Sequence, residues 1–77
     1  MSITPEQSRA ARALLGWSGR DLAEASKVHF TTLSRFERGG DAYRSTVDAL
    51  RAALEAAGVV FVGAGEASLS GGAGVRL

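Results

Sequence analysis

Apolar residues recur at helical spacing in four successive stretches of the chain, and the first of these starts just after Thr4. A proline follows Thr4, a glutamine stands three residues after it, and apolar residues then repeat three and four positions apart until Gly16. A capping hydroxyl before a proline is typical of a helix start, and a glycine is typical of a helix end. The pattern predicts a first helix from about residue 5 to about residue 15.

The next two helices are short and lie close together. Ser18 stands three residues before Asp21, which is the spacing of a capping box, and so begins the second helix. The apolar pattern breaks at residues 26–28 and resumes with Leu33 and Phe36, one helical turn apart. A pair of glycines then ends the predicted third helix.

The pattern changes after a fourth helix, for which Ser45 is the expected cap and Gly58 the expected end. Residues 59–62 are β-branched and aromatic and predict a strand, and residues 75–77 predict a second one. Residues 63–74 contain five of the ten glycines, so we expect a poorly ordered connection there.

These elements predict a mainly α fold of four helices with a short C-terminal β-strand or hairpin. We expect residues 1–58 to form the helical domain and residues 59–77 to form a C-terminal extension. Between the second and third helices, an apolar Val28 in the break and a small Ala23 before it favour a steep crossing. Such a crossing leaves one side of the third helix exposed, with Phe30, Thr31, Ser34, Arg35 and Arg38 on it.

Composition excludes several classes of protein. The chain has no cysteine and one histidine, His29, so we expect no catalytic residues, no metal site and no cofactor. Glu6, Arg9 and Arg12 interrupt the apolar pattern near the start of the chain, so we expect neither a signal peptide nor a membrane span, and a cytoplasmic location. Trp17 and Phe36 are expected in the core.

Charge adds only weak support for a nucleic-acid partner. The net charge is +1, but residues 1–44 hold seven lysines and arginines against five acidic residues, while residues 45–77 hold two against three. The basic excess therefore lies in the half of the chain that contains the closely spaced helices. Glu37 is expected to have a structural role, as a cap or as the ion-pair partner of Arg38 or of an arginine in the first helix.

At this point the chain resembles the phage-repressor-like helix-turn-helix family, also called the XRE or Cro/cI type. The resemblance covers residues 4–58 and is carried by residues 15–18, 21–23, Val28, residues 33–39, Leu50 and Leu54. It implies a lambda-repressor-like domain that binds double-stranded DNA, usually as a dimer, with the third helix in the major groove. The function it implies is a non-enzymatic transcriptional regulator, expected to be a repressor.

The resemblance also implies roles for individual residues. Phe30, Thr31 and Arg35 would face bases, with Ser34 close to bases or backbone. Arg35 would be the strongest reader, because a guanidinium pairs with guanine through two hydrogen bonds. Residues near the ends of these helices would contact phosphates, which fix the register on DNA. These are Ser18, Gly19, Arg20, Lys27, Arg38 and Arg44.

Three positions depart from the family pattern. Gly19 stands where a polar side chain commonly contacts the DNA backbone, so only backbone amides would remain there. Lys27 stands where the turn usually has glycine, so either the turn is strained or it differs. His29 is a weaker cap than serine or threonine.

The C-terminal strands are candidates for dimerisation, because a lone two-stranded hairpin is marginal in water. Residues 59–62 would pair with the same segment of a second subunit, or with residues 75–77 folded back across them. Either arrangement offers a two-fold interface, and the alternative is a flap that covers the fourth helix. The residues expected at a dimer interface are Val59, Val60, Phe61, Val62, Val75 and Leu77.

A second function stays open alongside the DNA-binding one. The same scaffold would serve as a protein-interaction module, such as an antiactivator or an antitoxin, that binds a protein partner through Phe30 and the C-terminal tail. The low net charge and Gly19 favour this alternative. Phe30 is either an apolar reader of DNA or part of an exposed patch for a protein, and the sequence leaves both open.

Overall fold

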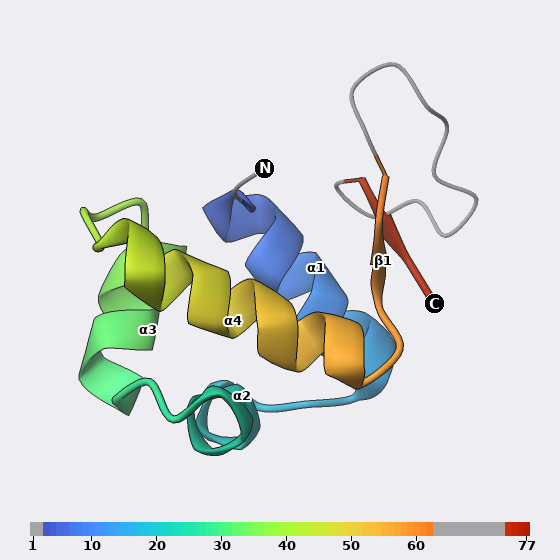
Figure 1. Cartoon of the computed structure of the whole chain (residues 1–77), viewed down its shortest axis with the longest axis horizontal. Helices are drawn as coiled ribbons and strands as arrows, with labels where there is room; N and C mark the ends of the chain where they lie inside the picture. The colour runs from blue at the N-terminus through green and yellow to red at the C-terminus, as the bar shows by residue number, and fades with distance from the viewer. Residues whose placement is uncertain (1–2, 63–73) are drawn as a thin grey trace.

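Four helices and a small antiparallel sheet make up the chain. The structure is a computed structural model that describes residues 3–62 and 74–77. Apart from Gly74, the predicted glycine-rich connection lies outside these residues. The mainly α fold with C-terminal strands is confirmed, and α3 and the strands lie near opposite ends of α4 (Figure 1). The elements are α1 (Pro5–Leu15), α2 (Gly19–Ser26), α3 (Phe30–Glu37), α4 (Arg44–Ala56), β1 (Val60–Phe61) and β2 (Val75–Arg76).

The first two helices begin at capping boxes, as predicted. Thr4 Oγ1 accepts a hydrogen bond from the Gln7 amide at 3.1 Å, and Gln7 Oε1 accepts one from the Thr4 amide at 2.9 Å. Ser18 and Asp21 exchange the equivalent two bonds at 3.1 and 2.9 Å. Gly16 ends α1 in the left-handed conformation with a φ of 69°. Local hydrogen bonds therefore set these boundaries.

The start of α4 differs from the prediction. Its N-cap is Tyr43, whose side chain makes no capping hydrogen bond, and Ser45 lies within the first turn of the helix. The Val47 amide donates to the Tyr43 carbonyl at 3.1 Å, and the Val47 and Leu50 side chains are buried. Burial of these two side chains, rather than a capping hydroxyl, accounts for the observed start. Gly58 follows the end of the helix with a φ of 107°.

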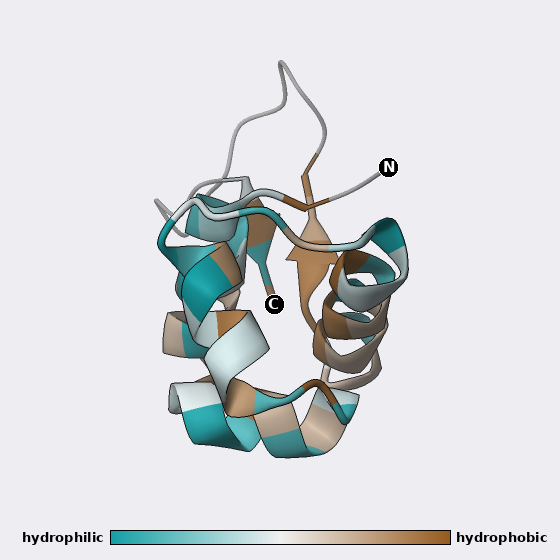
Figure 2. Cartoon of the chain, turned by 90° about the vertical axis from the view of Figure 1, so that its left-hand side faces the viewer, coloured by the Kyte–Doolittle hydropathy of each residue, from teal (hydrophilic) through white to brown (hydrophobic). Residues whose placement is uncertain are grey.

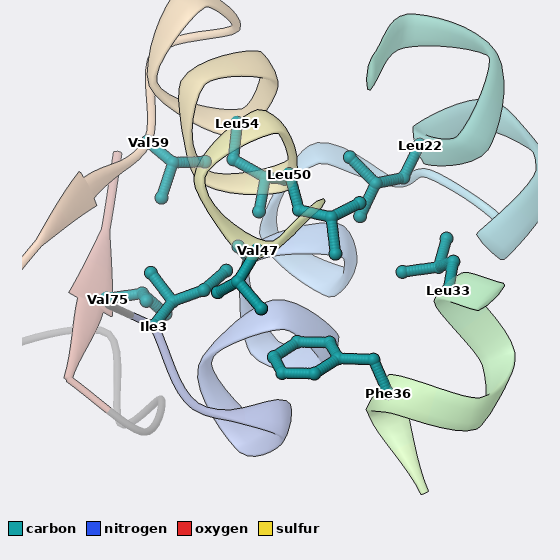
Figure 3. Packing of buried hydrophobic residues seen from close by; sticks show 10 residues of the cluster. Ile3, Leu22, Leu33, Phe36, Val47, Leu50, Leu54, Val59 and Val75 are labelled. Atoms are coloured by element: carbon teal, nitrogen blue, oxygen red, sulfur yellow. The ribbon is translucent and has the colours of Figure 1, made fainter. Parts of the chain in front are cut away.

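One hydrophobic core joins the four helices to the C-terminal strands (Figure 3). Leu22, Leu50, Leu54 and Val75 are fully buried, and complete burial of such a side chain stabilises a fold by about 1.5–3 kcal/mol. Trp17 packs against this core, as expected. The buried members of the core are Ile3, Ala11, Leu22, Leu33, Phe36, Val47, Leu50, Leu54, Val59 and Val75.

The two strands pair within the chain. Val60 is opposite Arg76 and Phe61 is opposite Val75 in an antiparallel register. Of the pairings that the sequence left open, the structure therefore has the intramolecular one. β2 packs against α1, so the strands are not a flap over α4 alone, and Arg51 of α4 lies over the Phe61 ring of β1 at 5.3 Å.

Candidate nucleic-acid interface

A short turn joins α2 to α3 and sets the direction of the third helix. Lys27 has a φ of 62° and is the one non-glycine residue with positive φ in residues 3–62 and 74–77. Of the two possibilities for this position, the strained left-handed backbone is observed, at a cost of about 1–2 kcal/mol. His29 caps α3, because its Nδ1 accepts a hydrogen bond from the Thr31 amide at 3.2 Å.

The two sides of α3 have opposite characters. Leu33 and Phe36 are buried in the core, whereas Thr31 and Arg35, one helical turn apart, are exposed. Ser34 is half-buried beside them. In Figure 2, where the α3 end of the molecule faces the viewer, the hydrophobic colours gather on α4 and the strands, behind or beside α3. This helix therefore presents a polar surface to the outside while its apolar residues fix it to the core.

A buried carboxylate fastens the last turn of α3 to α1. Glu37 is 7% exposed and accepts two hydrogen bonds from Arg12, from Nε at 2.9 Å and from Nη2 at 2.7 Å. The Ser8 hydroxyl, fully buried, donates to the same carboxylate at 2.6 Å, and Arg9 donates to the Glu37 carbonyl. The expected pairing of Glu37 with an arginine of the first helix is confirmed. This cluster holds α3 in place from the side opposite its exposed face.

Three of the predicted contact residues touch one another at the start of α2. Phe30, the first residue of α3, is 37% exposed, and its ring packs against Gly19. A Cβ atom on Gly19 would lie only 3.0 Å from Cε1 of this ring. The guanidinium of Arg20 lies over the same ring, with Cζ 4.6 Å from the ring centroid. Gly19, Arg20 and Phe30 therefore form one contact between α2 and α3.

The predicted guanine reader borders an open groove between α3 and the start of α4. This groove has a volume of about 630 Å³, and Arg35 lines it. A Cβ atom on Gly40 would lie 2.6 Å from Cγ of Arg35 and 2.9 Å from its carbonyl oxygen, so the loop after α3 packs closely against Arg35. The other lining residues are Thr32, Asp41, Ala42, Tyr43 and Thr46.

Sequence reasoning missed Tyr43 as a surface candidate. Its side chain is 83% exposed, and it stands directly before Arg44 at the start of α4. An aromatic residue within the polar stretch of residues 41–44 was the signal in the sequence. Gly40 was predicted only as part of a helix end, because its close approach to Arg35 depends on the path of the loop.

The predicted phosphate contacts lie at the ends of helices. Ser18 and Gly19 form the start of α2, Lys27 ends it, Arg38 is the C-cap of α3, and Arg44 begins α4. The four basic residues of this set, Arg20, Lys27, Arg38 and Arg44, are all exposed. The capping box pairs the backbone amides of Ser18 and Asp21. In the described part of the chain, no residue accepts a hydrogen bond from the two amides between them, those of Gly19 and Arg20.

The predicted dimerisation residues divide into buried and exposed ones. Val59, Val62 and Val75 are buried within the chain, and Phe61 is half-buried beneath Arg51. The Val62 amide donates to the Gly74 carbonyl at 2.6 Å, next to the paired strands. The remaining two, Val60 and Leu77, are 41% and 59% exposed.

Residues 3–62 and 74–77 contain neither a metal-binding cluster nor a membrane-spanning helix. No three histidine, aspartate or glutamate side chains gather there in a way that would hold a metal ion. No helix in that part has the length and apolar character needed to cross a membrane.

Comparison with known proteins identifies the family. A family model described as helix-turn-helix matches residues 9–59, which is more than half of the chain and includes α2, the turn, α3 and α4. No curated protein matches the chain. The matched family is a DNA-binding and non-enzymatic one, in agreement with the expectation that the protein is not an enzyme. The chain belongs to the helix-turn-helix family of the XRE, or Cro/cI, type.

Proposed function

We propose that this protein is a transcriptional repressor that binds a palindromic operator as a homodimer in the cytoplasm, with α3 in the major groove. The observation that carries this proposal is the exposed polar side of α3, where Thr31 and Arg35 project one turn apart from a helix fixed by its buried side. A helix of a helix-turn-helix unit reads bases with such outward side chains.

The base-reading residues differ in what they recognise. Arg35 pairs with a guanine through two hydrogen bonds, which discriminates against other bases by about 1–3 kcal/mol. Thr31 and Phe30 contact thymine methyl groups, and Ser34, half-buried, lies close to a base edge or the backbone. The packing of Gly40 against Arg35 supports the first assignment, because it limits the directions that the arginine takes.

Phosphate contacts fix the register of the domain on DNA. The Ser18 hydroxyl and the amides of Gly19 and Arg20 meet one phosphate at the start of α2, where the helix dipole favours an anion. Side chains at the other helix ends meet further phosphates, and Tyr43 adds a hydroxyl donor beside the first residue of α4. The side chains are those of Arg20, Lys27, Arg38 and Arg44.

Dimerisation uses the surface of the strand pair. Val60 and Leu77 are the apolar residues exposed there, and their burial between two subunits would remove apolar surface from water. The buried Val59, Val62 and Val75 and the half-buried Phe61 support this surface from within. A two-fold axis at this surface would relate the two recognition helices, which would then have to reach half-sites about 34 Å apart on the operator.

The experiment that tests the function is DNA binding by the purified protein. Operator sequences are selected from random duplexes and from the region upstream of the gene, and affinities are measured at two salt concentrations. Arg35→Ala and Thr31→Ala are compared with Arg51→Ala, which removes an arginine from α4. We expect the first two variants to lose specific binding and Arg51→Ala to keep it.

The outcomes separate DNA binding from the alternative function. Specific binding that falls by at least tenfold in Arg35→Ala, with an unchanged circular dichroism spectrum, supports the proposal. If the wild-type protein selects no sequence, or if all three variants bind alike, the proposal fails and a protein partner at Phe30 becomes the function to test. Val60→Lys tests the dimer, because a charge there is expected to give monomers in sedimentation equilibrium.

A further inference from the structure

The contact between α2 and α3 contains an arginine stacked on an aromatic ring. The Arg20 guanidinium lies 4.6 Å from the centroid of Phe30, and Gly19 lies against the ring edge. Under the proposed function these three residues have different roles, since Gly19 and Arg20 contact a phosphate and Phe30 contacts a base. Their mutual packing means that the position of each depends on the others.

An unsupported arginine on a surface samples many rotamers and loses that freedom when it binds. The negative face of an aromatic ring attracts a guanidinium, and at an exposed site this attraction favours the stacked position by about two- to fivefold. Phe30 therefore restricts Arg20 to the region beside the start of α2. The free amides of Gly19 and Arg20 lie at the same helix start.

We propose that Phe30 is a positioning residue for Arg20, which it holds in place for one DNA phosphate in each half-site, and that Gly19 is the residue that makes room for the ring. This inference rests on the proposed function. It assigns to Phe30 a second role besides contact with a base, and it explains the absence of a side chain at residue 19 by the space that the ring occupies.

Gly19 has a steric rather than a conformational reason to be glycine. Its φ is not positive, and it is the first residue of α2, where alanine is also acceptable. The 3.0 Å distance from a Cβ atom to Cε1 of Phe30 is shorter than an ordinary contact, so alanine forces the half-exposed ring to move. Gly19→Ala is therefore expected to displace the ring while it preserves the helix.

The slope of log affinity against log salt concentration separates phosphate contacts from base contacts. Each neutralised phosphate contributes about 0.9 to this slope on duplex DNA, whereas an apolar contact with a base contributes nothing to it. The variants are Arg20→Ala, Phe30→Leu and the double variant, with Phe30→Tyr to restore a ring. Arg51→Ala is the matched control, because Arg51 also lies over a phenylalanine ring, that of Phe61 in β1, which takes no part in the contact between α2 and α3.

We expect Arg20→Ala to lower the slope by about 0.9 per half-site, Phe30→Leu to lower it by part of that amount, and the double variant to lower it no further than Arg20→Ala. Phe30→Tyr and Arg51→Ala should keep the wild-type slope. The proposal is overturned if Phe30→Leu leaves the slope unchanged, or if the affinity losses of the two single variants simply multiply in the double variant.

A measurement without DNA checks the geometry. The ring current of Phe30 should shift the Arg20 side-chain protons in the NMR spectrum of the wild-type protein, and this shift should shrink in Gly19→Ala while the circular dichroism of the helices stays the same. An unshifted Arg20 in the wild type overturns the inference and leaves the proposed function standing. A wild type that binds no DNA sequence overturns both.

Discussion

Arg12 and Glu37 form a two-bond ion pair between α1 and α3, with donor-acceptor distances of 2.9 and 2.7 Å, although they are 25 positions apart in sequence. Their side chains are 20% and 8% exposed, so most of the pair is shielded from water. Because the pair lies at the last turn of α3, it ties the orientation of α3 to the position of α1.

Removal of this carboxylate should destabilise the fold strongly. Glu37→Ala leaves Arg12 and the Ser8 hydroxyl without their buried acceptor, and loss of one partner of a buried pair costs about 3–5 kcal/mol. We expect the free energy of unfolding to fall by about 3 kcal/mol, as measured by urea unfolding followed through Trp17 fluorescence. Glu55→Ala, which breaks the exposed pair with Arg51, is the control and should cost less than about 1 kcal/mol. Equal losses of unfolding free energy in the two variants would show that the buried Glu37 pair stabilises the fold no more than the exposed pair does.

Lys27→Gly should change stability and DNA binding in opposite directions. Glycine removes the strain of the left-handed backbone and should raise the free energy of unfolding by about 1 kcal/mol. The loss of one cation should lower the salt slope of DNA binding by about 0.9 per half-site. Lys27→Asn introduces a residue type that tolerates the left-handed conformation, and this variant should also bind DNA with the reduced salt slope. A glycine variant less stable than the wild type would contradict the assignment of strain.

Gly40→Ala should weaken DNA binding through Arg35. The new Cβ atom would lie 2.6 Å from Cγ of Arg35, so the arginine or the loop must shift, at a cost in stability of about 1–3 kcal/mol. We expect lower operator affinity in a binding titration at a temperature where the variant is folded. The control is the same change in an Arg35→Ala background, which lacks the Cγ atom but keeps the 2.9 Å contact with the carbonyl oxygen of residue 35. An equal further loss of affinity in that background would mean that the effect of Gly40→Ala does not pass through the Arg35 side chain.

Two valines in the paired strands should respond differently to the same change. Val75 is fully buried and Val60 is 41% exposed. Val75→Ala should lower the free energy of unfolding by about 2 kcal/mol, because it removes buried methyl groups and leaves a cavity. Val60→Ala should cost less than about 0.5 kcal/mol at protein concentrations too low for association. Thermal unfolding of both variants tests this, and a similar loss in both would argue that the strands do not belong to the core.

Local signals predicted the helices well, and nonlocal contacts explain what the sequence missed. The starts of α1 and α2 depend on bonds between residues three positions apart, so Thr4 and Ser18 were recognisable as caps. Ser45 was a wrong cap, because burial of Val47 sets the start of α4 and this depends on the whole core. The sequence also could not predict which strand pairs with residues 59–62, because their pairing with residues 75–76 depends on the nonlocal packing of β2 against α1.

For the candidate site, the pattern of α3 was enough to place Thr31 and Arg35 on its exposed side. The contact of Phe30 with Gly19 was out of reach, because it depends on how the turn at Lys27 brings the two helices together. From the sequence, Gly19 was therefore interpreted as lacking a side chain for the DNA backbone. In the structure, the ring of Phe30 occupies the space beside Gly19.

The packing of Gly19 against Phe30 also constrains how such a protein changes over generations. A larger residue at position 19 crowds the aromatic ring, and a smaller residue at position 30 leaves a gap above the glycine. Each single substitution therefore passes through an intermediate with poorer fit, and a new pair of residues at these positions is reached more easily by two changes together. Descendants of this chain that acquire a different operator should show linked replacements at positions 19 and 30.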